Sequence, residues 1–273
     1  MGGEDRYLVL QKCSDSENLV LGMAAGAIEA VATQPLTYTK NARQQGLPYT
    51  LNPRLLYRGV LASAANDSTL TGVQFVLAGF FQKLITGGKQ RSMTFAEEVG
   101  AGMASGAVSG IPCTIMELTM IQQQRFGGGV ADTLQRIVQE RGPMGLMRGF
   151  LPAAGREAFF TAGYLGVSPW LHVRFSESMH PFAANFLASS IGGVSAAALT
   201  HPLDTIKSCM QGDIQQKQYT SFTATARALY KEGGLPYFFR GFGARSSMIV
   251  LCFLIFNEVK LGLAPLFFPA KCA

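Results

Sequence analysis

The sequence contains few charged residues and few long polar stretches. Only 15% of its 273 residues are Asp, Glu, Lys or Arg, whereas soluble domains have roughly 25%. No residue of these four types occurs in 68–82, 99–116, 187–203 or 246–257. These ranges approach the roughly 17–25 apolar residues that span a bilayer, although Gly, Ser, Thr and Gln interrupt them. They favour membrane-embedded helices over the alternative, a soluble protein with buried helices.

Residues that build metal sites and enzyme centres are also scarce or scattered. The five cysteines form no Cys-x-x-Cys pair and the three histidines join no group of ligands, so we expect free thiols, no metal and no cofactor. The sequence lacks GxSxG, P-loop, HExxH and dinucleotide-binding patterns, and we therefore do not expect an enzyme. The first 12 residues resemble neither a signal peptide nor a transit sequence.

The net charge of +6 does not indicate a nucleic-acid-binding protein. No basic face with interleaved aromatic residues is visible, and nucleic acid is not an expected partner. The basic residues gather instead at the ends of the uncharged segments. That placement suits membrane lipids, cardiolipin among them, or an anionic solute.

Three segments of the chain repeat one pattern, which is the strongest signal in the sequence. They are GMAAGAIEAVATQPLTYTKNARQQ, AGMASGAVSGIPCTIMELTMIQQQ and SSIGGVSAAALTHPLDTIKSCMQG. Each has a stretch of small residues, a proline and a polar helical turn that reaches glutamine. Each is followed by a second shared element (LYRGV, LMRGF or FFRGF) and another apolar segment. Three copies of two segments predict six helices.

The prolines at the centre of the repeats are Pro35, Pro112 and Pro202. A proline inside a helix removes a backbone donor and kinks the helix. Three kinks around a pseudo-threefold axis would let the following halves of the helices converge and close a cavity. The polar residues after each proline would then meet at the closure point.

The repeats resemble the mitochondrial carrier family, whose signature is Pro-x-Asp/Glu-x-x-Lys/Arg with a glutamine downstream and then an aromatic-Arg-Gly element. The third copy matches it fully through Pro202, Asp204, Lys207 and Gln211, and the first copy keeps Gln44. The resemblance covers about residues 18–260. It implies an all-α membrane protein with six transmembrane helices, arranged as a pseudo-threefold bundle of three two-helix repeats with short matrix-side helices. It also implies a multi-pass protein of the inner mitochondrial membrane.

The resemblance divides the chain into three repeats, 18–90, 91–178 and 179–266, between tails 1–17 and 267–273. We expect the first repeat to lack its matrix helix, because fewer residues separate Pro35 from Arg58 than separate the corresponding pairs, and Pro48 and Pro53 lie between. We also expect the sixth helix to be shortened at its start.

Two of the three signature motifs depart from the family pattern at the matrix gate. Threonine replaces the acid in the first two copies, and Glu117 stands at the basic position of the second. The family's cyclic arrangement implies that Asp204 pairs with Lys40. We hypothesise that Glu117 and Lys207 pair with each other, so that the four charges sum to zero. The alternative is that these charges only hold the helices together.

The family binds solutes at mid-cavity on its even-numbered helices. Carried over position by position, the resemblance implies contacts from Leu70, Gln74, Arg156, Glu157 and either Arg245 or Met248. Two arginines and one or two carboxylates could hold an anion or a zwitterion, such as a small carboxylate or an amino acid. Alternatively, Arg156 and Glu157 have a structural role and satisfy neighbouring polar groups inside the bundle.

The gate on the opposite side is expected to be weak. The family's aromatic-acid-x-x-base pattern is reduced here to Phe256, Asn257 and Lys260, and the other copies retain less of it.

Two functions follow from these observations. The first is a carrier of a small solute, working by alternating access. The second is a non-transporting pseudo-carrier that serves as a structural subunit of a large inner-membrane assembly, for example a respiratory complex or ATP synthase. The retained third motif and the cavity arginines favour the first, while the lost signature acids and the missing matrix helix favour the second.

Overall fold

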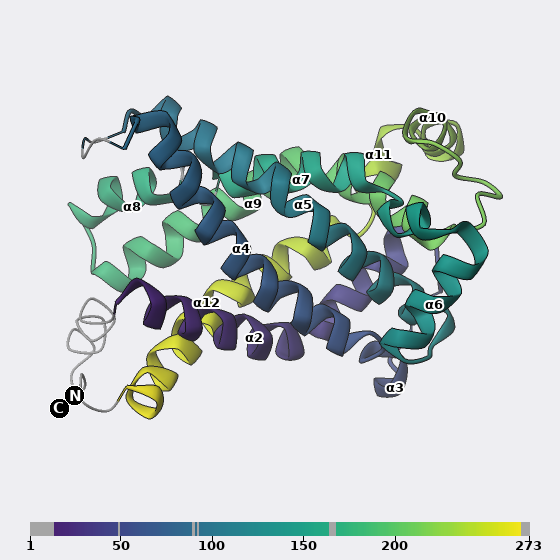
Figure 1. Cartoon of the computed structure of the whole chain (residues 1–273), viewed down its shortest axis with the longest axis horizontal. Helices are drawn as coiled ribbons and strands as arrows, with labels where there is room; N and C mark the ends of the chain where they lie inside the picture. The colour runs from purple at the N-terminus through teal and green to yellow at the C-terminus, as the bar shows by residue number, and fades with distance from the viewer. Residues whose placement is uncertain (1–13, 49, 89–90, 92, 164–167, 269–273) are drawn as a thin grey trace.

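The computed structural model describes residues 14–48, 50–88, 91, 93–163 and 168–268, and every regular element in these ranges is a helix. The all-α fold class is thereby confirmed. The long helices and their shorter companions appear in Figure 1. They are α2 (Asp15–Gln44), α3 (Pro53–Leu56), α4 (Val60–Thr86), α5 (Phe95–Phe126), α6 (Val130–Arg141), η1 (Pro143–Met147), α7 (Phe150–Ala162), α8 (Ser168–Ser176), α9 (Pro181–Gly212), α10 (Phe222–Gly233), α11 (Leu235–Phe238) and α12 (Phe242–Phe267).

Capping residues fix where two of the long helices begin. Ser14 and Glu17 form a capping box at the start of α2, and Thr94 and Glu97 form one at the start of α5. Each box satisfies backbone N–H groups that have no partner within the helix. In the described part of the chain, the segments Leu19–Gln44, Phe95–Phe126 and Phe182–Gly212 are long and apolar enough to cross a membrane. These three segments are the proline-containing members of the repeats.

The three repeat prolines lie inside long helices rather than at their ends. Pro35 is within α2, Pro112 within α5 and Pro202 within α9. Each helix continues on both sides of its proline despite the missing backbone donor. The kink expected at each proline stays a prediction.

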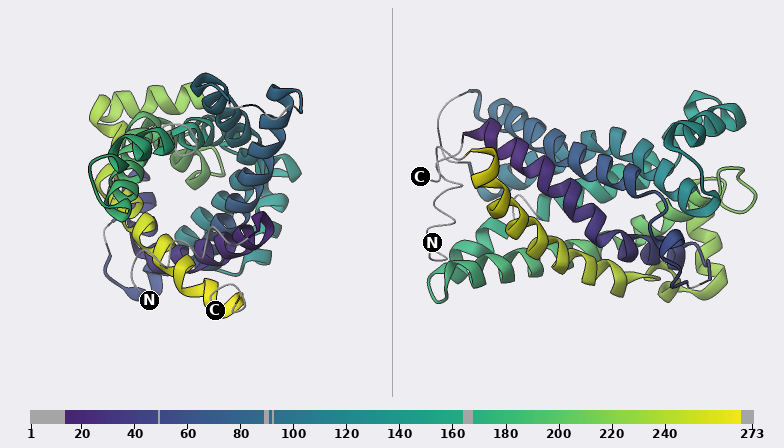
Figure 2. Two further views of the ribbon diagram at one scale, coloured as in Figure 1. Left: turned by 90° about the vertical axis from the view of Figure 1, so that its left-hand side faces the viewer. Right: turned by 90° about the horizontal axis from the view of Figure 1, so that it is seen from below.

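The long helices form a ring in chain order. Contacts join α2 to α4, α4 to α5, α5 to α7, α7 to α9, α9 to α12 and α12 back to α2, and α8 also packs on α9. Figure 2 (left) shows this ring along the long axis of the molecule. The short helices α3, α6 and α10 lie together at one end, on the right of Figure 1.

The connections within the repeats differ in length. A 12-residue helix follows α5 (α6) and another follows α9 (α10), but between α2 and α4 the described residues form only the four-residue α3. Pro48 and Pro53 both lie in this connection, and Pro53 occupies the first turn of α3, where a missing N–H is tolerated.

The second helix of each repeat begins at an equivalent glycine. Gly59, Gly149 and Gly241 precede α4, α7 and α12 with φ values of +79°, +78° and +79°, which other residues rarely adopt. The expected shortening of the sixth helix at its start is therefore wrong: α12 begins in the same register as the other two. The earlier arginine in α12 reflects a different sequence, not a missing turn.

Glycines also allow close contact between α5 and α7. A Cβ at Gly106 would overlap the backbone of Glu157, and one at Gly110 would lie 2.8 Å from the Cα of Ala154. Small residues at such crossings let helix backbones approach in a lipid environment. This contact sets the position of α7, which carries Arg156 and Glu157.

Candidate functional site

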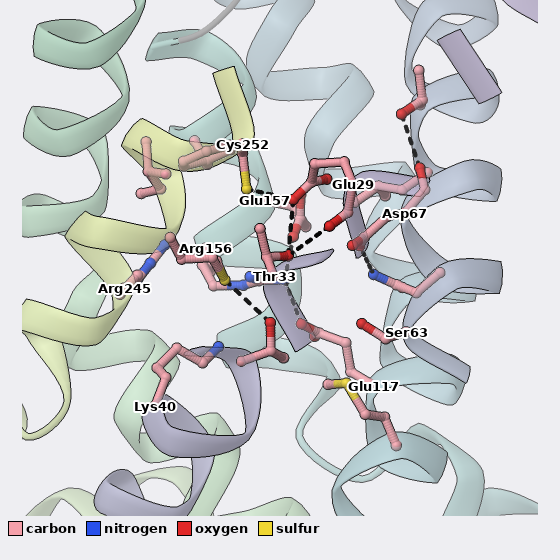
Figure 3. Close-up of a pocket in the computed structure, with 18 of the residues that line it drawn as sticks. Glu29, Thr33, Lys40, Ser63, Asp67, Glu117, Arg156, Glu157, Arg245 and Cys252 are labelled. Atoms are coloured by element: carbon pink, nitrogen blue, oxygen red, sulfur yellow. Dashed lines mark hydrogen bonds and ion pairs between the residues drawn. The ribbon is translucent and has the colours of Figure 1, made fainter. Parts of the chain in front are cut away.

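The ring encloses a cavity of about 260 Å³ lined by α2, α4, α5, α7 and α12 (Figure 3). The structure brings together all the side chains that the resemblance placed at mid-cavity. The lining includes Leu70, Gln74, Arg156, Glu157, Arg245 and Met248. Lys40 and Glu117, expected at the gate, also reach the cavity. The site is therefore assembled from helices far apart in the sequence.

A fully buried carboxylate, Asp204, lies at the centre of the polar cluster at the cavity base. The amino nitrogen of Lys40 lies 3.2 Å from Asp204 Oδ2, and that of Lys207 lies 3.1 Å from Oδ1. Gln44 donates to Oδ2 at 2.7 Å. The structure thus contains the α2–α9 contact that the family arrangement implies, with the glutamine of the first repeat added to it.

A second acid, Glu117, extends the cluster from α9 to α5 and α7. Its carboxylate lies 2.8 Å from the amino nitrogen of Lys207 and accepts a hydrogen bond from Arg156 at 3.0 Å. The structure therefore places Glu117 and Lys207 side by side. Arg156 also contacts Glu157 and lies 3.7 Å from Asp204. One connected cluster of charges joins α2, α5, α7 and α9.

Arg245 lines the cavity and also belongs to this cluster. It is 3% exposed, donates to Thr200 Oγ1 at 3.0 Å and lies 3.7 Å from Asp204 Oδ2. Counted from the glycine that precedes each helix, Met248 on α12 occupies the same position as Arg156 on α7. The Met248 sulfur accepts a hydrogen bond from Thr37 at 3.2 Å. The third repeat thus contributes a thioether where the second contributes a guanidinium.

The cluster carries a net positive charge. Four bases (Lys40, Arg156, Lys207 and Arg245) lie among three acids (Glu117, Glu157 and Asp204), and four minus three leaves a formal charge of +1. Charges away from water are costly unless paired, and the surplus attracts an anion. The cavity base therefore suits a carboxylate group of a small solute.

The two glutamines that follow the motifs have different contacts. Gln44 bonds to Asp204, whereas Gln211 donates to the backbone oxygens of Thr114 and Arg148 at 3.3 and 3.4 Å. Gln211 therefore ties α9 to α5 and to the turn before α7, and it takes no part in the charge cluster.

The Arg-Gly element of the second repeat, in which Met147 precedes Arg148, binds the loop after α9. The Arg148 guanidinium donates to backbone oxygens of Met210 at 2.6 Å and Asp213 at 3.0 Å. Burial works to raise the pKa of Asp213, but hydrogen bonds from the N–H groups of Tyr219, Gln218 and Lys217 hold that pKa below its usual value.

Sequence reasoning missed Asp67 and Ser63, which line the cavity from α4. The repeat register could have found the first of these. Asn66 and Asp67 follow Gly59 by the same distances as Arg156 and Glu157 follow Gly149. The side chains of Phe256, Asn257 and Lys260, expected at the opposite gate, lie outside the described residues. In the described part of the chain, no group of His, Cys, Asp and Glu side chains could hold a metal ion.

Comparison with known proteins gives one family and several relatives. The family model described as "Mitochondrial carrier protein" matches residues 91–179 and 178–263. The relatives transport chemically different solutes by name. A tricarboxylate transporter of Gibberella moniliformis is 26% identical over 90% of this chain and 89% of its own length. A probable mitochondrial 2-oxoglutarate/malate carrier protein of Dictyostelium discoideum is 26% identical over 84% of this chain and 83% of its own length. Mitochondrial glycine transporter A of Danio rerio is 29% identical over 70% of this chain and 68% of its own length.

Proposed function

The chain belongs to the mitochondrial carrier family, and from this premise we propose that it moves a small solute across the inner mitochondrial membrane by alternating access. The solute is a carboxylate or an amino-acid-like molecule. Six membrane-crossing segments surround a pseudo-threefold axis in this proposal, with α6 and α10 on the matrix side. The repeated sequence, the equivalent starts of α4, α7 and α12 and the closed ring of helix contacts support it.

The observation that carries the proposal is a small cavity whose base is closed by ion pairs between the proline-containing helices. Lys40–Asp204 joins α2 to α9, and Glu117–Lys207 joins α5 to α9. A bound carboxylate would compete with Glu117 and Glu157 for Arg156. Weakened pairs at the base would then let the ends of the proline-containing helices separate. A solute shifts such an equilibrium only by its different affinity for the two states.

The pseudo-carrier alternative rested on the lost signature acids and on the missing matrix helix of the first repeat, where the described residues form only the four-residue α3. Ion pairs of Glu117 with Lys207 and Arg156 support a closed base despite the loss of those acids. The relatives are transporters by name and lend no support to the role of a structural subunit. Membrane lipids such as cardiolipin are further proposed partners, consistent with the basic residues at the segment ends.

Replacing Arg156 tests the proposal. We expect Arg156→Ala to abolish uptake of the transported solute by liposomes that contain the purified chain, because the cavity would lose the guanidinium that bridges Glu117 and Glu157. Arg174→Ala, at an exposed position on α8, is the matched control and should keep full uptake. Undiminished uptake by a folded Arg156→Ala variant would remove this residue from the site.

A further inference from the structure

Two carboxylates on the cavity wall have no cation beside them. Glu29 on α2 is 8% exposed, and Asp67 on α4 lines the same cavity. Within the described ranges, no Lys, Arg or His nitrogen lies within 4.0 Å of either carboxylate. The cations of the cluster lie elsewhere: Figure 3 draws Lys40, Arg156 and Arg245 on the left, with Glu29 and Asp67 at the upper right.

Glu29 and Asp67 act on one another across a close helix crossing. A Cβ at Gly26, one turn before Glu29, would lie 3.4 Å from the backbone oxygen of Asp67. Two ionised carboxylates held at such a crossing would repel each other. Their hydrogen bonds come from neutral groups: Thr33 and Cys252 donate to Glu29, and Asn66 donates to Asp67. Two acids in this position leave a negative charge without compensation, which is costly inside a membrane protein.

Two further polar groups of α4, Ser63 and Asn66, line the same cavity as the two acids. Ser63 is 3% exposed and lines the cavity, and Figure 3 draws no hydrogen bond from its hydroxyl to the other residues shown. In Figure 3 the Ser63 hydroxyl points toward the cavity. The amide oxygen of Asn66, a residue that is 7% exposed, is buried and lacks a partner in the described part of the chain. Buried polar groups are ordinarily satisfied, so the Asn66 oxygen indicates a missing hydrogen-bond donor. Ser63 adds a hydroxyl on the wall of the same cavity.

We propose that Glu29, Asp67, Ser63 and the Asn66 oxygen form an ammonium site, so that the solute carries an amino group as well as a carboxylate. This inference rests on the proposed transport function and narrows its substrate class to zwitterionic, amino-acid-like molecules. An ammonium group has three N–H donors and one positive charge, so it could bond to three of these four groups and offset one of the two carboxylate charges. The carboxylate end of the solute would lie toward the positively charged base of the cavity, where Arg156 is located. The cavity of about 260 Å³ limits the solute to a small molecule.

The test uses pairs of solutes that share a carbon skeleton and differ at one position. Liposomes containing the purified full chain are given glycine or glycolate, aspartate or malate, and glutamate or 2-oxoglutarate. Citrate is added as a carboxylate without an amino group. We expect uptake of the amino member of at least one pair to exceed that of its partner. Equal or greater uptake of the members without an amino group would overturn the ammonium site while leaving transport itself supported.

Variants then assign the preference to the two carboxylates. We expect Glu29→Gln and Asp67→Asn each to lower the ratio of amino to non-amino uptake by at least about tenfold, the effect of losing a hydrogen bond between charged groups. Glu140→Gln, on the exposed face of α6, is the matched control and should keep the wild-type ratio. An unchanged ratio in both folded cavity variants would overturn the assignment. Where a variant fails to fold, the ratio of the wild-type chain still decides.

The competing hypothesis is that these oxygens bind a free cation instead of an ammonium group. If uptake of citrate or malate required Na⁺, K⁺ or a proton gradient, and Glu29→Gln removed that requirement, the carboxylates would bind a co-transported ion and the ammonium site would be overturned. Absence of uptake for every solute would instead contradict the proposed transport function itself.

Discussion

Asp204 depends on its neighbours more than any other residue at the cavity base. Its carboxylate is fully buried and faces Lys40, Lys207 and Gln44. A buried ion pair contributes little net stability, but removing one partner leaves the other charge uncompensated. The ion pairs of Asp204 therefore add little net stability, but removing its carboxylate would leave buried lysines without their acceptor.

Replacing this carboxylate by a neutral amide should destabilise the closed form. We expect Asp204→Asn to lower the free energy of unfolding by about 3–5 kcal/mol, because Lys40 and Lys207 would lose their shared acceptor. Thermal unfolding of the purified chain in mild detergent measures the change. Glu140→Gln, on the exposed side of α6, should leave the transition where it is. An Asp204→Asn transition equal to that of the control would show that the cluster does not hold the helices together.

The contact between Glu117 and Lys207 calls for a double-mutant cycle. A charge swap is a poor test because each residue has a second partner: lysine at 117 would face Arg156, and glutamate at 207 would be next to Asp204. With Glu117→Gln and Lys207→Met, we expect the double variant to be less destabilised than the sum of the single variants by roughly 0.5–3 kcal/mol. Additive effects would show that the two charges do not stabilise each other.

The contacts among the charged residues that follow the prolines were more predictable than their contacts with α7. The repeat motifs predicted that Lys40, Glu117, Asp204 and Lys207 would meet, since each follows a repeat proline by a fixed number of residues. The bond from Arg156 to Glu117 could not be predicted, because it depends on how far α7 lies along α5. No sequence pattern states that offset.

At the scale of helices, the offset between α5 and α7 is set by glycine. Gly102, Gly106 and Gly110 all face α7 backbone or Cα atoms, whereas a Cβ at Gly100 would meet nothing within 4 Å. Gly100 and the three glycines that face α7 lie on the same helix and differ in what an added Cβ would meet.

This difference gives a matched pair of substitutions. We expect Gly106→Ala to lower the free energy of unfolding by about 1–3 kcal/mol, because the added methyl group would force α7 away from α5. Gly100→Ala should be neutral or stabilising by up to about 1 kcal/mol, since alanine favours a helix. Denaturation of both variants in one detergent measures the difference. Equal stability of the two variants would contradict the close packing of α5 and α7.

The register of α12 shows where element-scale prediction failed. The position of Arg245 suggested a helix shortened at its start, but α12 begins directly after Gly241, as α4 and α7 begin after Gly59 and Gly149. The conformation of the glycine decides where the helix begins, and a single arginine carries no such information.

For the whole molecule, the all-α class and the family were predictable because three repeats occur in order. The solute was not, since the cavity combines side chains from five helices whose relative rotation the sequence does not state. The relatives do not supply it either, because their names include tricarboxylate, 2-oxoglutarate/malate and glycine transporters.

The size of the particle in its native membrane separates a free carrier from a fixed subunit. We expect the chain, extracted in mild detergent and run on a native gel, to migrate near its monomer mass of 29.3 kDa, plus bound detergent and lipid. A free carrier needs no permanent partner to form its cavity, because one chain supplies the ring of helices. Stable migration within a large assembly would favour the structural role.

The central claim is that this chain transports a small solute, and uptake by liposomes containing only the purified wild-type chain tests it most directly. The amino, hydroxy and keto acids named above, together with citrate, are supplied in labelled form, and empty liposomes give the background. The account predicts saturable uptake of at least one solute above that background. Uptake at background for every solute, by chain that unfolds cooperatively and is therefore folded, would contradict it.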